Sequence, residues 1–192
     1  ARHTDAQVCV MGKLSKSMLS WLVAIIVSTL PVMAVAEIDL FSNDRLIEAT
    51  KADDQTGAES LLVRGHNVDV RDENRRTSLF FAAIQGNEDF VELLLRFNPR
   101  INTVDKFGSS PLYYAAAGNN VGVIEMLAEK GANLNAQNRQ GLTPLMVAAS
   151  EGHLAAVQAL LDLKADSTLT DFTGRTAFDW ALRNNRQAVV RF

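Results

Sequence analysis

Apolar residues recur along the chain at helical spacing, in short stripes that lie 33 residues apart. Val157, Leu160 and Leu161 form one stripe, in which positions i, i+3 and i+4 share one side of a helix. The equivalent stripes earlier in the chain are Ala58, Leu61 and Leu62, then Val91, Leu94 and Leu95, then Ile124, Leu127 and Ala128. This pattern predicts short helices, each with one buried face, in a unit that repeats.

A second signal in the same register marks a helix start in each unit. The triplet Thr143-Pro144-Leu145 has counterparts at residues 77–79, 110–112 and 176–178. The Thr143 hydroxyl can accept a hydrogen bond from a free backbone N–H at a helix start, and proline at the first helical position loses none. We therefore expect two short helices per unit, one starting at the triplet and one carrying the apolar stripe.

The end of the second helix also has a recurring signal. Gly131 stands where a helix can end in the left-handed conformation that glycine adopts freely. Asn98, the usual second choice, and Lys164 occupy the same position in neighbouring units. Lys164 fits this conformation less well and is expected to cost about 1 kcal/mol of local stability.

These motifs together resemble the ankyrin repeat family, whose unit reads D-x-x-G-x-T-P-L-H-x-A-A-x-x-G-H and ends in L-L-x-x-G-A. The best match runs from Asn138 to Ala165 and contains Gly141, Thr143-Pro144-Leu145, Ala148-Ala149, Gly152-His153 and Leu160-Leu161. The resemblance implies an all-α ankyrin-repeat solenoid of about five 33-residue helix-turn-helix units with β-hairpin-like loops. Within a repeat domain at 37–192, the expected units are 39–71 as a cap, 72–104, 105–137, 138–170, and 171–192 as a cap.

The terminal units of such a stack are expected to be polar on their outer sides. In the first unit Leu46 takes a buried position, and the solvated outer face consists of Arg45, Glu48, Lys51, Asp53 and Asp54. The last unit begins at Asp171 and stops at Phe192, before a full second helix. Either a short cap or a longer natural chain fits this ending.

The segment at 11–36 is typical of a secretory signal peptide, with cleavage expected after Ala36. Lys13 and Lys16 precede an uncharged run from Met18 to Leu30, and Pro31 separates this run from Ala34-Val35-Ala36. An uncleaved membrane anchor is the alternative, because the apolar stretch approaches spanning length. Residues 1–10, which include Cys9, have an unclear status upstream of Met11. Cleavage would leave a chain without cysteine, which suits an oxidising compartment and points to the bacterial periplasm.

Composition and motifs argue against several function classes. The chain has a formal net charge of −3, and the predicted cleavage shifts the charge to about −5, which disfavours a nucleic-acid ligand. The sequence shows no metal, nucleotide or nucleophile motif, so we expect neither an enzyme nor a bound cofactor or metal. The resemblance assigns His153 to packing and hydrogen bonding between helices, and His66 is expected at the surface near a cap.

The resemblance also implies a concave binding face, formed by the residue after the His position of T-P-L-H-x and by the hairpin residues. The register places Phe81, Tyr114, Val147 and Trp180 along the first helices, as a ladder. The predicted hairpin contacts are Arg76, Lys106, Phe107, Arg139, Leu142, Phe172 and Arg175, and their neighbours Glu73, Asn74, Ser109, Gln140 and Thr173 share the surface. Aromatic anchors flanked by arginine are typical of protein-binding hot spots. Alternatively the rings pack between repeats, because Phe80, Tyr113 and Met146 fill the His position and could draw the ladder into the core.

The predicted function is therefore non-enzymatic binding of another protein by an exported monomer that contacts neither nucleic acid nor, after cleavage, the membrane. The chain resembles bacterial exported ankyrin proteins, some of which are associated with catalase function and oxidative-stress defence. An immunity protein that neutralises a secreted toxin is one alternative. A host-directed ankyrin effector is another, although a standard signal peptide leaves delivery to a host unexplained.

Overall fold

The computed structural model describes residues 42–192, which lie in one compact unit, Leu40–Phe192. The predicted signal peptide at 11–36, the upstream residues 1–10 and Cys9 lie outside the described residues. The described part contains ten helices: α2 Ser42–Lys51, α3 Gln55–Val63, α4 Ser78–Gln85, α5 Glu88–Leu95, α6 Pro111–Ala117, α7 Val121–Glu129, α8 Pro144–Glu151, α9 Leu154–Asp162, α10 Ala177–Arg183 and α11 Gln187–Val190.

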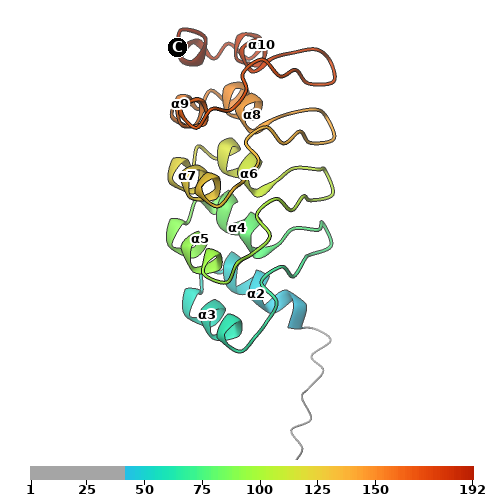
Figure 1. Ribbon diagram of the computed structural model, residues 1–192, viewed down its shortest axis with the longest axis vertical. Coiled ribbons are helices and arrows are strands. Elements are labelled where there is room, and N and C mark those ends of the chain that lie inside the picture. The colour runs from blue at the N-terminus through green and yellow to red at the C-terminus, as the bar shows by residue number, and fades with distance from the viewer. Residues whose placement is uncertain (1–41) are drawn as a thin grey trace, which may run out of the picture. The chain divides into compact units, whose positions relative to one another are not determined.

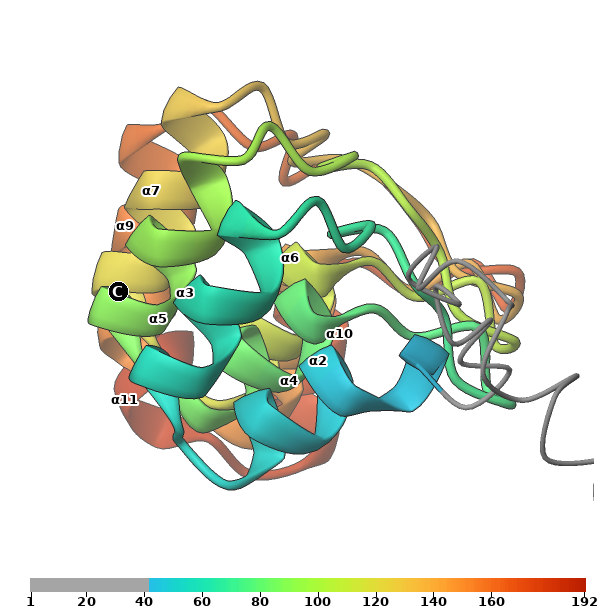
Figure 2. The ribbon, with the colours of Figure 1, turned by 90° about the horizontal axis from the view of Figure 1, so that it is seen from below.

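These helices stack as five pairs in two layers. One layer contains α2, α4, α6, α8 and α10, each in contact with the next, and the other contains α3, α5, α7, α9 and α11. The loops that connect successive pairs project on the side of the first layer, away from the second (Figures 1 and 2). This arrangement confirms the predicted all-α solenoid of helical pairs, and no strand occurs between residues 42 and 192.

The first helices start where the triplets predict, and in all but one of the four units a hydroxyl side chain makes the predicted capping bond. The Thr143 hydroxyl accepts from the N–H of Met146 at 3.2 Å, and Pro144 occupies the first turn. Ser110 caps α6 in the same way, and Thr176 forms a capping box with Asp179. Thr77 makes no side-chain capping bond. The hydroxyl side chain therefore supports the first helix in three of these four units.

One continuous core joins the pairs, and the apolar stripes lie in it. Ala58, Val91, Ile124 and Val157 are all at most 4% exposed. The stripes include only part of the buried surface of the second helices. The residues just before three of these positions, Phe90, Val123 and Ala156, are fully buried as well. Each second helix therefore contacts the core through a wider face than the i, i+3, i+4 pattern indicates.

The two ends of the stack differ in polarity. At the N-terminal end Leu46 is buried, and Arg45, Glu48, Lys51, Asp53 and Asp54 are exposed, as expected. At the other end Phe178 and Leu182 are 54% and 55% exposed, in the register where Leu145 and Ala149 are buried in the preceding unit. The expectation of a polar outer side was therefore wrong for the last unit.

The predicted left-handed helix ends are confirmed. Gly131 has a φ of +80°, Asn98 of +50° and Lys164 of +71°. A Cβ atom added at Gly131 would meet no atom within 4 Å, so a substitution there strains only the backbone. Lys164 experiences that strain in the native protein.

We expect Lys164→Gly to raise the free energy of unfolding by up to about 1 kcal/mol, because glycine adopts a positive φ without steric cost. Gly131→Val is the converse variant and should lower the same quantity by about 1 to 2 kcal/mol. Urea unfolding followed by circular dichroism measures both. Equal midpoints for Lys164→Gly and the unmodified protein would contradict the assigned strain.

Candidate functional site

A carboxylate or amide side chain closes each of the four described hairpin loops. The Oδ1 atom of Asp105 accepts the backbone N–H groups of Phe107 at 2.8 Å and Ser109 at 2.9 Å. The same two bonds, to residues two and four positions ahead, are made by Asp72, Asn138 and Asp171. Each loop is therefore held by its first side chain in one shape.

Backbone hydrogen bonds also join each hairpin to the next. The N–H of Lys106 donates to the carbonyl of Asn74 at 2.9 Å, and the N–H of Arg139 donates to the carbonyl of Phe107 at 2.9 Å. A longer bond of 3.4 Å joins Phe172 to Gln140. The hairpins therefore form a connected row at a fixed spacing, beside the first helices (Figure 1).

Two rings of the predicted ladder are tied to this row. The Tyr114 hydroxyl donates to Oδ2 of Asp105 at 2.7 Å, and the Trp180 indole N–H donates to Oδ2 of Asp171 at 3.1 Å. Both rings are half-buried. Their polar atoms bond the carboxylates that close their own hairpins. Tyr114 and Trp180 thus support the loop and line the surface together.

The other two ladder positions behave differently. Phe81 is half-buried, with the Arg76 guanidinium 4.9 Å and the Lys51 ammonium 5.0 Å from the centre of its ring. Val147 is only 8% exposed, so it contributes little to the face, contrary to the expectation for this position. Val147 belongs to a run of buried apolar residues in α8, Pro144 to Ala149, and its aliphatic side chain needs no polar partner there.

Two adjacent pockets open between consecutive hairpins. One has a volume of about 320 Å³ and the other of about 330 Å³. Both pockets include predicted contact residues, and Gln140 lines both of them. The pocket of about 320 Å³ is lined by Phe107, Tyr114 and Arg139, together with Ser109, Tyr113, Asn138 and Gln140. The pocket of about 330 Å³ is lined by Leu142, Phe172, Arg175 and Trp180, together with Gln140, Asp171 and Thr173. Seven predicted contact residues thus lie together.

Sequence reasoning missed Tyr113, Asn138 and Asp171 as lining residues. Tyr113 stands at the position that was assigned to packing, and it is partly exposed, with its ring edge-on to the Tyr114 ring at 5.7 Å between centroids. Asn138 is buried at the start of its hairpin. The register of the unit indicated that all three lie near a loop, but it carried no sign of which atoms reach the pocket.

Positively charged side chains lie beside the pockets, and of these Arg175 is half-buried and the others are exposed. Lys106 lies over the Phe107 ring at 5.2 Å, and Arg175 and Arg183 lie 5.8 and 5.3 Å from the centre of the Trp180 ring. Arg139 is exposed. In contrast, Asp105 and Asp171 are 1% and 5% exposed and are used in hydrogen bonds. The surface therefore presents cations and aromatic rings together.

Hydrogen bonding also sets the protonation of the buried groups. Burial alone raises the pKa of a carboxyl, but Asp171 accepts from the Thr173 hydroxyl, from two backbone N–H groups and from Trp180, which together hold its pKa at about 2. Burial and the bond to Asp105 raise the pKa of Tyr114 well above its usual value of 10. Asp171 is therefore ionised and Tyr114 protonated throughout the physiological range.

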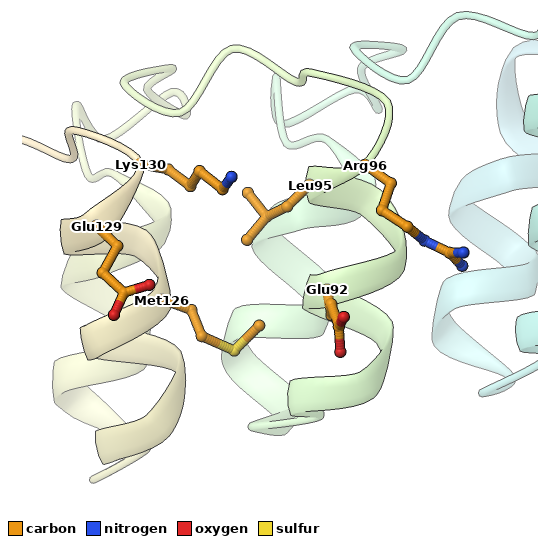
Figure 3. Close-up of a pocket in the computed structure, with 6 residues that line it drawn as sticks. All are labelled: Glu92, Leu95, Arg96, Met126, Glu129 and Lys130. Atoms are coloured by element: carbon orange, nitrogen blue, oxygen red, sulfur yellow. The ribbon is translucent and has the colours of Figure 1, made fainter.

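A separate pocket of about 330 Å³ lies on the outer layer between α5 and α7 (Figure 3). Leu95, Met126 and Lys130 point into the space between the two helices, whereas Arg96 extends away from α7 and pairs with Glu59. Glu92 and Glu129 complete the lining. This mixed-charge depression contains none of the predicted contact residues. It offers no exposed aromatic side chain of the kind found beside the hairpins.

The remaining candidates for chemistry are structural or scattered. His153 Nε2 lies 3.0 Å from the carbonyl oxygen of Ala117 in the preceding unit, and His66 Nδ1 lies 2.9 Å from that of Leu61. Residues 42–192 contain no group of three His, Cys, Asp or Glu side chains that could hold a metal ion. Within the same residues, no helix is both long and apolar enough to cross a membrane.

The fold and this surface define a class of protein, a stack of helical repeats with a row of hairpins that presents side chains for binding. The family model described as ankyrin repeats (3 copies) matches residues 46–138, and the family model described as ankyrin repeats (many copies) matches residues 126–181. The chain belongs to the ankyrin repeat family, whose repeats form protein–protein interaction modules. A comparison with curated proteins found no match.

The Asp171 bonds predict a pH-dependent contribution to stability, which Asp171→Asn isolates. Asn138 shows that an amide can make the same two Oδ1 bonds, but the substitution replaces the acceptor of the Trp180 N–H with a donor. We expect the variant to be about 1 to 2 kcal/mol less stable near neutral pH. In the unmodified protein this contribution is complete above the unfolded pKa of about 3.9 and is lost as the pH falls through the folded pKa of about 2.

The measurement is urea unfolding of both proteins at neutral pH and again near pH 2. All other carboxyl groups are common to the two proteins, so the difference between them reports Asp171. This difference should narrow as the pH falls. A difference of the same size at both pH values would show that the carboxylate charge is not what stabilises the hairpin.

Proposed function

We propose that this protein binds a partner protein through the two pockets between its hairpins, with Phe107 and Phe172 as the anchors, and carries out no reaction itself. One observation carries the proposal: these two rings are 57% and 72% exposed, and each forms a wall of a pocket. Neither ring supports the core, so their exposure has a cost that binding would offset. Exposed aromatic side chains beside arginine are the residues that dominate binding energy at protein interfaces.

The proposed setting is the bacterial periplasm, which the chain would reach through a cleaved signal peptide at residues 11–36. The basic, apolar and small-residue order of that segment supports export. The proposed role is support of oxidative-stress defence in association with catalase, as in the exported bacterial ankyrin proteins that the sequence resembles. Toxin neutralisation and action on a host remain the alternative roles for the same surface.

Export is tested by expressing the full chain in bacteria with a C-terminal tag and determining where the protein is found and which residue begins it. The proposal expects a periplasmic protein that starts at Glu37, because the small residues Ala34 and Ala36 mark the cleavage site. Ala36→Arg is the control and should block processing. A chain that keeps its apolar segment and sediments with membranes would instead establish the anchor.

The binding site is tested by a pull-down from periplasmic extract with the unmodified protein and a Phe107→Ser/Phe172→Ser variant. We expect the variant to lose the partner, with a loss in affinity of more than about 2 kcal/mol, while its unfolding midpoint changes little. Val63→Ser/Ile84→Ser is the matched control, since these apolar side chains are 72% and 40% exposed but line neither pocket.

Identification of the captured protein then separates the roles. A catalase or another oxidative-defence protein supports the leading proposal, and a secreted toxin supports the immunity alternative. If the Phe107/Phe172 variant and the Val63/Ile84 variant retain the same partner equally well, the pockets are not its binding site.

A further inference from the structure

The charge around the pockets differs in sign from the charge of the chain. The whole chain has a formal net charge of −3, yet Arg139 and Arg175 line the two pockets, and Lys106 and Arg183 lie over the Phe107 and Trp180 rings that form their walls. Asp171 also lines one pocket, but it is only 5% exposed and its oxygens accept hydrogen bonds from the protein itself. Within residues 42–192, none of these four side chains forms an ion pair. Arg175 acts electrostatically on Asp179 without forming an ion pair with it. Four cations gathered without an ion-pair partner favour a ligand that supplies the negative charge.

Aromatic rings hold three of these cations in place without neutralising them. Lys106 lies over Phe107, and two arginines lie over Trp180. Arg175 is held further by a bond of 2.6 Å from its Nη1 to the Thr173 hydroxyl. A guanidinium that stacks on a ring keeps N–H groups at its edge, where they can donate to a carboxylate.

The spacing of the pockets limits the shape of the ligand. They belong to consecutive units and share Gln140 as a common wall. Packed helices lie about 8 to 10 Å apart, which sets the approximate distance between equivalent points of neighbouring units. A polyproline II segment rises about 3.1 Å per residue and returns to the same face every third residue, so residues i and i+3 are about 9 Å apart on one side.

Resting on the proposed function, we infer that the two pockets bind an acidic, extended segment of the partner protein. Two large apolar side chains at positions i and i+3 enter the pockets, against Phe107 and Tyr114 in one and Phe172 and Trp180 in the other. Carboxylates beside these anchors pair with Arg139 and Arg175. Aromatic-lined grooves receive extended segments in this way because the ligand loses little conformational freedom on binding.

A single-stranded nucleic acid is the competing ligand class, because rings and cations together can also stack bases. The charges along the row of hairpins favour a nucleic acid less than they favour an acidic peptide. The exposed carboxylate of Glu73 lies in the same row, and the chain as a whole is acidic. A continuous basic track that follows a phosphate backbone is therefore lacking on the described hairpins.

The test measures binding of fluorescent peptides to the full chain by anisotropy. The first peptide has Leu and Phe at i and i+3 flanked by Glu, the second replaces every Glu with Lys, and the third keeps Glu but places the anchors at i and i+2. We expect the first peptide to bind at least about tenfold tighter than either of the others, and its affinity to fall as salt rises. A labelled single-stranded oligonucleotide is the fourth probe and should bind more weakly than the first peptide.

Two charge variants of the protein locate the contact. Arg139→Gln/Arg175→Gln should lose at least about tenfold in affinity for the acidic peptide. Arg96→Gln/Lys130→Gln removes the same amount of charge beside the outer pocket and should leave the affinity unchanged (Figure 3). Circular dichroism of both variants checks the fold, and the peptide series on the unmodified protein tests the inference independently of either variant.

Equal binding of the acidic and basic peptides, tighter binding of the oligonucleotide, or binding of no peptide would each overturn the inference. These outcomes are distinct from failure of the proposed function. If the Phe107/Phe172 variant loses the captured partner while the acidic peptide shows no preference, the protein-binding surface stands and only the acidic segment is wrong. If that variant keeps the partner, both are wrong.

Discussion

The hydrogen bonds from two backbone N–H groups to one side-chain oxygen at the start of each hairpin hold the loops on which the candidate site depends. Asp72, Asp105, Asn138 and Asp171 all make these bonds through Oδ1. A closed loop can then bond the next loop through its backbone, and the pockets are the spaces between such neighbours. Because the loops have a fixed shape before any ligand binds, binding does not carry the entropy cost of ordering them.

The second side-chain atom of the same residue explains why the ladder is not uniform. Oδ2 accepts from the ring of Tyr114 in the Asp105 unit and from the ring of Trp180 in the Asp171 unit. In the Asp72 unit Oδ2 accepts from Arg76, so the ladder ring of that unit need not supply a donor, and Phe81 has none. In the Asn138 unit the equivalent atom is a donor, bonded to the Ser109 hydroxyl, so an aromatic donor would have no acceptor there, and Val147 stands in its place. The ladder thus follows the chemistry of one side chain per unit.

The repeat made much of this structure predictable, and the limits of prediction are physical. A register of 33 residues identified the helix starts at Ser110 and Thr143 and the left-handed ends at Gly131 and Lys164, because these depend on local backbone geometry. It could not show that the polar atoms of Tyr114 and Trp180 turn inward, since a register places a residue on a face without naming its hydrogen-bond partner. The apolar C-terminal end was visible in principle, because Phe178 and Leu182 stand where Leu145 and Ala149 are buried.

Stability and binding are therefore joined at some positions of this surface and separate at others. Removing Trp180 would leave Asp171 without one of its donors, so a loss of binding in that variant would not distinguish a ligand contact from a weakened hairpin. Phe107 and Phe172 contribute apolar walls to the pockets while remaining mostly in solvent, and their loss changes few native contacts. Lys106 and Arg183, which lie above the Phe107 and Trp180 rings, have the same advantage, since neither forms an ion pair within residues 42–192. The side chains that the fold needs least are thus the ones that report binding most directly.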